Sequence, residues 1–225
     1  MNVQLDETWR ADHRGAVVGF LELHGAENPA HSDVLTEHVR RVEAALRDEL
    51  RGATREALAR LPELEAYRTY YRRYEKTYHV LLQLESVVLK GKPLRSNGAL
   101  VLAMFAAELR SRLLTAGHDL DAVAGGITVG SAAGDERYTG LGGRELTLRS
   151  GDMFMRDDAG VISSVLYGPD DRTQIRAGTR RAIFCVYGPA GIRPEWVDAH
   201  LDDIAGNARR VAPAATVAQK VVLTA

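Results

Sequence analysis

The sequence predicts an α+β protein with a helical N-terminal half and a mainly antiparallel β-sheet in its C-terminal half. Up to about residue 114, most apolar residues recur every three or four positions, which is the period of helices packed on one face. From Gly117 onward, short β-type runs alternate with glycine and aspartate turns. No repeat or low-complexity linker separates the halves, so we expect a single domain over residues 1–225, with its core at about residues 15–212.

Composition narrows the class of protein. The 225 residues are 45% hydrophobic and 26% charged, as in soluble globular proteins, and the net charge of −1 argues against a strongly basic nucleic-acid binder. The only cysteine, Cys185, excludes an internal disulfide framework and suits a reducing compartment. No signal peptide or membrane-spanning run is apparent. We therefore expect a cytoplasmic protein with no membrane partner.

The first elements follow from local signals. The apolar run between Gly15 and Gly25 predicts a strand, and Ser32 is the expected N-cap of a helix that ends near Gly52. Thr54 should begin a second helix, and Pro62 suits the first turn of a third.

The stretch AYRTYYRRYEKTYH interleaves tyrosines with arginines. One interpretation is a stacking and phosphate-binding surface for RNA. The other is an amphipathic helix with its tyrosines inside, and the helical spacing of these tyrosines favours it.

Two further helices should follow, at LLQLESVVLKGK and ALVLAMFAAELRSRLLTAG, with the first half of the second one buried. Between them, Lys90, Lys92 and Arg95 form a basic cluster that could contact RNA phosphates. Arg110 and Arg112 add further positive charge, although a solvated helix face explains these arginines equally well.

In the second half, residues 127–188 predict one mainly antiparallel sheet with the helix Leu100–Leu114 packed against it. A closing helix is expected at PEWVDAHLDDIAGNARRVAP, and the tail AATVAQKVVLTA is either loose or an edge strand.

The stretch TAGHDLDAV suggests a metal site, a proton-transfer site or a structural turn. Adjacent residues of a strand point to opposite faces, so His118 and Asp119 are poorly placed to share an ion, whereas Asp119 and Asp121 could. A capping role for both aspartates is the favoured interpretation. His118 is the better candidate for chemistry because it titrates near neutral pH.

Other motifs have structural explanations. TGLGGRE lacks the strand-then-helix context of a phosphate loop and predicts a β-hairpin. Ser163 and Ser164 lie inside a predicted strand rather than on a nucleophile elbow, and Cys185 lies in an apolar run.

A specific succession of residues runs through the second half. After the helix SNGALVLAMFAAEL come Asp119-Leu120-Asp121, Gly134 with Glu136, the run Thr139–Gly143, Asp152 with Asp158, Gly168, Thr173 and Thr179. In this order they resemble the B3/B4 domain of the phenylalanyl-tRNA synthetase β chain. The first half resembles freestanding versions of that domain, so the resemblance covers about Gly15 to Ala212.

In that family the domain hydrolyses the ester of tyrosine mischarged onto the phenylalanine tRNA, because a first pocket rejects a hydroxylated isostere poorly. The resemblance implies a B3/B4-like fold and a trans-acting aminoacyl-tRNA deacylase with tRNA as partner. The ester is already activated, so neither a protein nucleophile nor a cofactor or metal is expected. His118 is the candidate for orienting water or a carbonyl.

The resemblance also implies the substrate pocket. The family's pocket glutamate, histidine and threonine-asparagine pair are replaced here by Cys185, Ala116 and Met104-Phe105, and a glycine by Leu166. The implied pocket residues are Met104, Phe105, Ala116, Gly140, Leu166, Gly168 and Cys185. These replacements predict an apolar pocket that favours an apolar aminoacyl group over tyrosyl.

Two alternatives remain open at this point. One is a non-catalytic tRNA-binding or protein-binding module that kept the scaffold, and the other is a binder or enzyme for a small apolar molecule. The basic cluster supports the RNA readings, and the sequence leaves the oligomeric state, the amino acid and the tRNA open.

Overall fold

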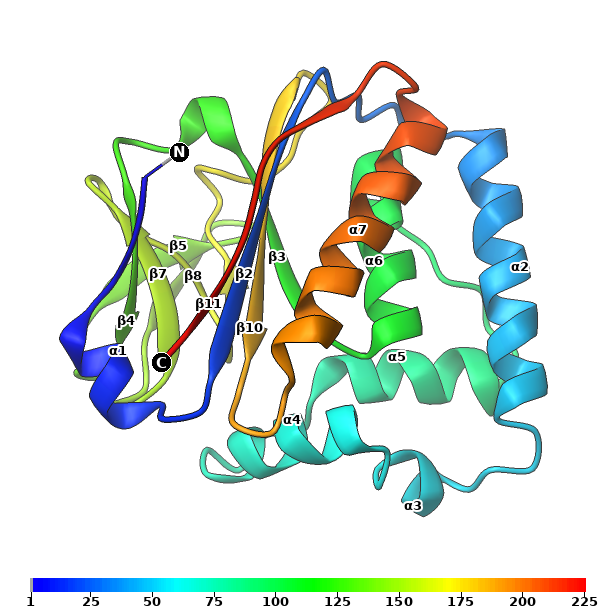
Figure 1. The fold of residues 1–225 in the computed structure, drawn as a ribbon, viewed down its shortest axis with the longest axis horizontal. Coiled ribbons are helices and arrows are strands. Elements are labelled where there is room, and N and C mark those ends of the chain that lie inside the picture. The colour runs from blue at the N-terminus through cyan, green and yellow to red at the C-terminus, as the bar shows by residue number, and fades with distance from the viewer. Residues whose placement is uncertain (1) are drawn as a thin grey trace.

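The computed structural model describes residues 2–225 and confirms the α+β class (Figure 1). The helices are α1 (Glu7–Asp12), α2 (Asp33–Glu49), α3 (Arg55–Leu58), α4 (Pro62–Arg72), α5 (His79–Val88), α6 (Ala99–Ser111) and α7 (Pro194–Val211), with a 3-10 turn η1 (Leu120–Ala122). The strands are β1 (Val3–Leu5), β2 (Val17–His24), β3 (Leu114–Asp119), β4 (Ile127–Ser131), β5 (Arg137–Gly140), β6 (Arg144–Thr147), β7 (Met153–Asp157), β8 (Gly160–Ser164), β9 (Gly168–Pro169), β10 (Arg181–Gly188) and β11 (Thr216–Thr224).

The central sheet has the order β11-β2-β10-β3 and is antiparallel throughout. Phe20 of β2 lies opposite Cys185 on one side and Val221 on the other. The tail therefore forms an edge strand, and β3 forms the opposite edge. Both edge strands come from parts of the sequence far from β2.

A second sheet has the order β1-β4-β7-β8-β9, in which β1 is parallel to β4 and the other pairs are antiparallel. Strands β5 and β6 form the predicted hairpin. The expected single sheet over residues 127–188 is wrong, because β10 joins the central sheet instead. Alternation of side chains marks a strand but carries no information about its partner.

The helices lie mainly on one side of the central sheet, with α6 and α7 beside it and α2 farther out (Figure 1). A Cβ on Gly19 of β2 would lie 2.4 Å from Val197 and 3.1 Å from Leu201, so the missing side chain allows α7 to approach the strand. The other face of the central sheet meets the second sheet, where the hydroxyls of Ser163 and Tyr187 lie 2.6 Å apart. The result is a helical layer, a central sheet and a second sheet.

Most local predictions for the helix starts hold. Ser32 accepts a hydrogen bond from the amide of Leu35, Thr54 caps α3 in the same way, and Pro62 is the first residue of α4. The helix expected to reach Leu114 is shorter, because Arg112 adopts a left-handed conformation (φ 66°) that ends α6. The chain then enters β3. None of the helices within residues 2–225 combines the length and apolarity needed to cross a membrane.

The tyrosines of the Tyr-Arg stretch are inside the protein, which confirms the amphipathic interpretation. Tyr67, Tyr70, Tyr71, Tyr74 and Tyr78 are all buried, and the rings of Tyr67 and Tyr78 stack 4.2 Å apart. The stretch is not one helix, since α4 ends at Arg72 and α5 begins at His79. These rings fill the base of the helical layer rather than offering a stacking surface to RNA.

Candidate functional site

A cavity of about 580 Å³ opens where the helical layer meets the edge of the central sheet. Helices α5 and α6, the edge strand β3, the segment 95–98 that precedes α6, and the segment around β9 enclose it. We call it the main cavity. Its apolar surface comes from Val101, Met104, Phe105, Leu114, Ala116, Leu141 and Ile175. Its polar side chains are those of Asn28, His79, Gln83, Arg95, Ser96, Asn97, Glu108, Thr115 and Gln174.

Four of the residues expected in the pocket meet at this cavity. Met104 and Phe105 come from α6, Ala116 from β3, and Gly168 from β9. Gly140 does not line the cavity, but the next residue, Leu141, does so from the turn between β5 and β6, with half of its surface exposed. Four of the seven expected pocket residues thus line one cavity, on α6, β3 and β9.

Two expected pocket residues lie elsewhere. Cys185 is completely buried in β10, and burial raises the pKa of its thiol. Leu166 is buried between β8 and β9, where its amide donates to Asp152. Cys185 lies opposite Ala116 of β3, but Ala116 lines the cavity and Cys185 does not.

The catalytic candidate His118 also lies outside the main cavity. Its ring is completely buried, and Nδ1 lies 2.7 Å from Oγ1 of Thr173. Burial lowers its pKa to about 4, so the ring is neutral at physiological pH. The structure therefore places His118 among the side chains that hold β3 against the segment after β9.

The stretch that contains His118 forms a structural turn. Asp119 caps η1 by accepting from the amide of Asp121 at 3.1 Å, and its second oxygen accepts from the hydroxyl of Thr179 at 2.7 Å. Asp121 pairs with Arg181 at 2.8 Å. Both aspartates thus have structural partners, and residues 2–225 contain no group of three or more metal-binding side chains.

The sequence interpretation missed Glu108, a carboxyl group on the wall of the main cavity. Its Oε1 accepts from the amide of Thr115 at 2.6 Å, whereas its buried Oε2 has no hydrogen-bond partner. Burial raises its pKa to about 8, although the hydrogen bond from the amide of Thr115 opposes that shift. A signal existed in the sequence, because Glu108 interrupts the apolar face of α6.

A buried network holds Thr115 next to Glu108. The Thr115 hydroxyl lies 2.7 Å from Nε2 of His200, and Nδ1 of that ring lies 2.8 Å from the hydroxyl of Ser111. Burial lowers the pKa of His200 to about 3, so this ring stays neutral. The network links α6, α7 and β3, and it holds the edge strand β3 in place where it lines the cavity.

The segment 95–98 is anchored where it enters α6. Oδ1 of Asn28 accepts from the amide of Leu100 at 2.9 Å. A Cβ on Gly98 would lie 2.4 Å from that same oxygen, so only glycine permits this close approach. Asn28 therefore fixes the wall of the main cavity from a distant part of the chain.

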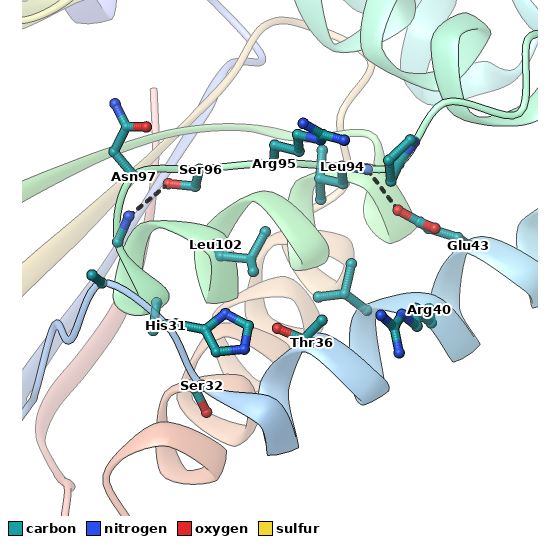
Figure 2. Close-up of a pocket in the computed structure, with 15 residues that line it drawn as sticks. His31, Ser32, Thr36, Arg40, Glu43, Leu94, Arg95, Ser96, Asn97 and Leu102 are labelled. Atoms are coloured by element: carbon teal, nitrogen blue, oxygen red, sulfur yellow. Dashed lines mark hydrogen bonds between the residues drawn. The ribbon is translucent and has the colours of Figure 1, made fainter.

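A second, smaller groove of about 410 Å³ lies on the other side of this segment, against α2 (Figure 2). His31, Thr36 and Arg40 line it from the α2 side, while Glu43 accepts from the amide of Leu94 at 2.6 Å. Arg95, Ser96, Asn97 and Gly98 line both hollows. The segment 95–98 is thus a wall shared by the two.

The basic cluster leads to this wall. Lys90, Lys92 and Arg95 are exposed between α5 and α6, and none of them forms an ion pair within residues 2–225. Arg95 lines both hollows, whereas Lys90 and Lys92 line neither. One cation of the cluster, Arg95, therefore lies at the main cavity, and the two lysines precede it in the chain.

Residues 108–205 match the family model of the B3/4 domain. Among solved structures, an N-terminal fragment of the phenylalanyl-tRNA synthetase β-subunit from Pyrococcus horikoshii is similar, with a TM-score of 0.49 and 12% sequence identity. The similarity covers 98% of this chain and 50% of that fragment, so the chain spans half of its length. No curated protein matches the chain by sequence. The family match runs from Glu108, on the wall of the main cavity, into α7, so this part of the chain is similar to the B3/4 domain.

Proposed function

We propose that this protein binds tRNA and hydrolyses mischarged aminoacyl-tRNA in trans, with the aminoacyl group in the main cavity. The observation that carries the proposal is the convergence of Met104, Phe105, Ala116 and Gly168 on one cavity inside or beside the region of the B3/4 match. The cavity has the size range and the largely apolar wall of small-molecule sites. Its apolar residues suit an apolar aminoacyl group better than tyrosyl.

The reaction needs water and a polarised ester. Water attacks the ester carbonyl, the bond from the carbonyl carbon to the ribose oxygen breaks, and the ribose hydroxyl leaves with a proton. His79 is the histidine that lines the cavity. Its side chain is exposed, and desolvation by the surrounding protein lowers its pKa, so its neutral form can accept a proton from water. We propose His79 for this role in place of His118.

The tRNA backbone would pass over the exposed cations of the 90–95 segment. Phosphate contacts supply most of the sequence-independent affinity for nucleic acid, and they weaken steeply with salt. Arg95 is well placed to hold a phosphate near the ester, because it lines the cavity.

A deacylation panel tests the proposal. Leucyl-, valyl-, phenylalanyl- and tyrosyl-tRNA are incubated with the wild type, with Phe105→Glu and with His79→Gln. We expect hydrolysis of at least one apolar substrate, and a loss of about tenfold or more in both variants, since general acid–base groups contribute roughly 10²–10⁴-fold. Val34→Glu is the control for Phe105→Glu, because Val34 is exposed and lines neither hollow.

Binding is measured separately from chemistry. Changing Lys90, Lys92 and Arg95 to glutamate should weaken tRNA binding. The slope of the logarithm of the binding constant against log[salt] should become less steep by about 2 to 3. The same change at Arg10, Arg14 and Arg60, which are exposed and line neither hollow, is the control. No measurable tRNA binding at low salt contradicts the proposal, and binding without hydrolysis of any substrate favours the non-catalytic module.

A further inference from the structure

Two buried side-chain oxygen atoms on the wall of the main cavity have no hydrogen-bond partner among the residues that the structure describes. Oε2 of Glu108 on α6 and Oε1 of Gln83 on α5 make no hydrogen bond within residues 2–225, and both side chains line the cavity. Other polar side chains on this wall are engaged, including Asn28 with the amide of Leu100 and Thr115 with His200. Because unpartnered buried acceptors are costly, a site that keeps two of them is suited to a ligand that donates hydrogen bonds.

Glu108 also forms no ion pair with Arg95, the arginine that lines the same cavity from the segment before α6. No lysine or arginine within residues 2–225 forms an ion pair with it. The titratable groups near it are neutral at physiological pH: burial raises the pKa of Tyr67, Tyr71 and Tyr78 on the α4 and α5 side, and lowers the pKa of His200 on α7 and of His79 on α5. A buried carboxylate is stable only when it is paired. The partner that the protein does not supply would come from the ligand.

We propose that the main cavity binds the primary amine of its ligand through Glu108, with the side-chain oxygen of Gln83 as a further acceptor. The apolar body of the ligand then lies against Met104, Phe105 and Ile175. Every aminoacyl ester carries such an amine, so the inference deepens the proposed function and rests on it for the identity of the substrate. The amine chemistry itself rests only on the cavity.

Binding moves one proton. The empty site holds Glu108 mainly protonated at neutral pH, since its pKa is raised to about 8. When a ligand ammonium enters, the carboxyl group gives its proton to solvent and the two opposite charges pair. Calorimetry at pH 7 in buffers of different ionisation enthalpy should therefore detect up to one proton released per amine bound, and none in Glu108→Gln.

The probes for affinity are phenylalanine methyl ester and its N-acetyl derivative, which has the same body without the ionisable amine. We expect the wild type to bind the free amine about ten- to a hundredfold more tightly, the range for a charged hydrogen bond. Glu108→Gln should reduce this preference to about twofold or less, and Gln83→Leu should reduce it in part. Glu85→Gln is the control, because Glu85 is a buried carboxyl group of α5 that pairs with Arg55 and does not line the cavity.

Equal affinity of the wild type for both probes, or an unchanged preference in Glu108→Gln, overturns the inference. So does the absence of binding by either probe. Tighter binding of N-acetyltyrosine methyl ester than of phenylalanine methyl ester would also overturn it, because the cavity would then select a hydroxyl group.

The two proposals fail separately. Amine-selective binding without hydrolysis of any aminoacyl-tRNA sinks the deacylase and leaves the amine site standing. Equal hydrolysis of phenylalanyl-tRNA and N-acetylphenylalanyl-tRNA supports the deacylase and removes the amine site.

Discussion

Glu108 makes the stability of this protein depend on pH. Its pKa rises from an ordinary value of 4.5 to about 8 on folding, so between these values the folded protein holds a proton that the unfolded chain releases. The free energy of unfolding therefore falls as the pH rises through this interval, by at most about 1.4 kcal/mol per pH unit. A neutral amide at this position has no such dependence.

Glu108→Gln should consequently lose less stability than the wild type between pH 5 and pH 8, by about 1 to 4 kcal/mol, in urea unfolding followed by circular dichroism. Asp152, whose pKa burial raises to about 7, titrates in both proteins and cancels in the comparison. Parallel curves of stability against pH would show that Glu108 is ionised in the folded protein.

At the same scale, some of the residues expected in the pocket line the main cavity and others do not, for identifiable reasons. Met104 and Phe105 follow from their place on α6, because a helix that packs beside a sheet edge presents neighbouring residues there. Cys185 and His118 lie in apolar strand segments, and such a sequence pattern is expected both for core residues and for pocket residues. Both side chains are completely buried. Glu108 was missed because a single charged residue in an apolar helix can be paired with a residue that is distant in the sequence. Only the structure shows that its Oε2 has no hydrogen-bond partner.

At the scale of elements, α4 is fastened to the central sheet by one hydroxyl group. Tyr67 donates to the carbonyl of Tyr187 in β10 at 2.6 Å and accepts from the amide of Leu114 in β3 at 2.9 Å. Tyr67→Phe leaves both backbone groups buried without a partner, so we expect a loss of about 1–3 kcal/mol in the free energy of unfolding. Tyr167→Phe is the control in the same urea titration, because that hydroxyl makes no hydrogen bond within residues 2–225. Equal stability of the two variants would contradict this role.

The elements themselves were largely predictable and their pairing was not. Ser32, Thr54 and Pro62 are local signals for helix starts, and each acts within a few residues of the chain. The left-handed Arg112 ends α6 without a glycine, so the sequence gives no warning there. Strand pairing joins distant residues such as Phe20 and Val221, and no local pattern specifies it.

At the scale of the whole molecule, the segment that matches the B3/4 domain depends on residues outside it. Residues 108–205 contain β3 and β10 but not β2 or β11, and β2 is the strand between β10 and β11. They also lack Tyr67 and the rest of α4. A purified fragment of residues 108–205 should therefore show no cooperative thermal unfolding and poor dispersion of amide resonances, in contrast to the full chain. A cooperative transition in the fragment would show that its own strands suffice for a core.

The place of β2 also governs how the chain assembles. Its two partners, β10 and β11, lie in the last part of the sequence, so very long loops must close before either of its edges is covered. Loop closure of this kind slows folding and leaves strand edges open to pairing between molecules. Refolding yield should therefore fall as the protein concentration rises, even though the finished molecule encloses β2 on both sides.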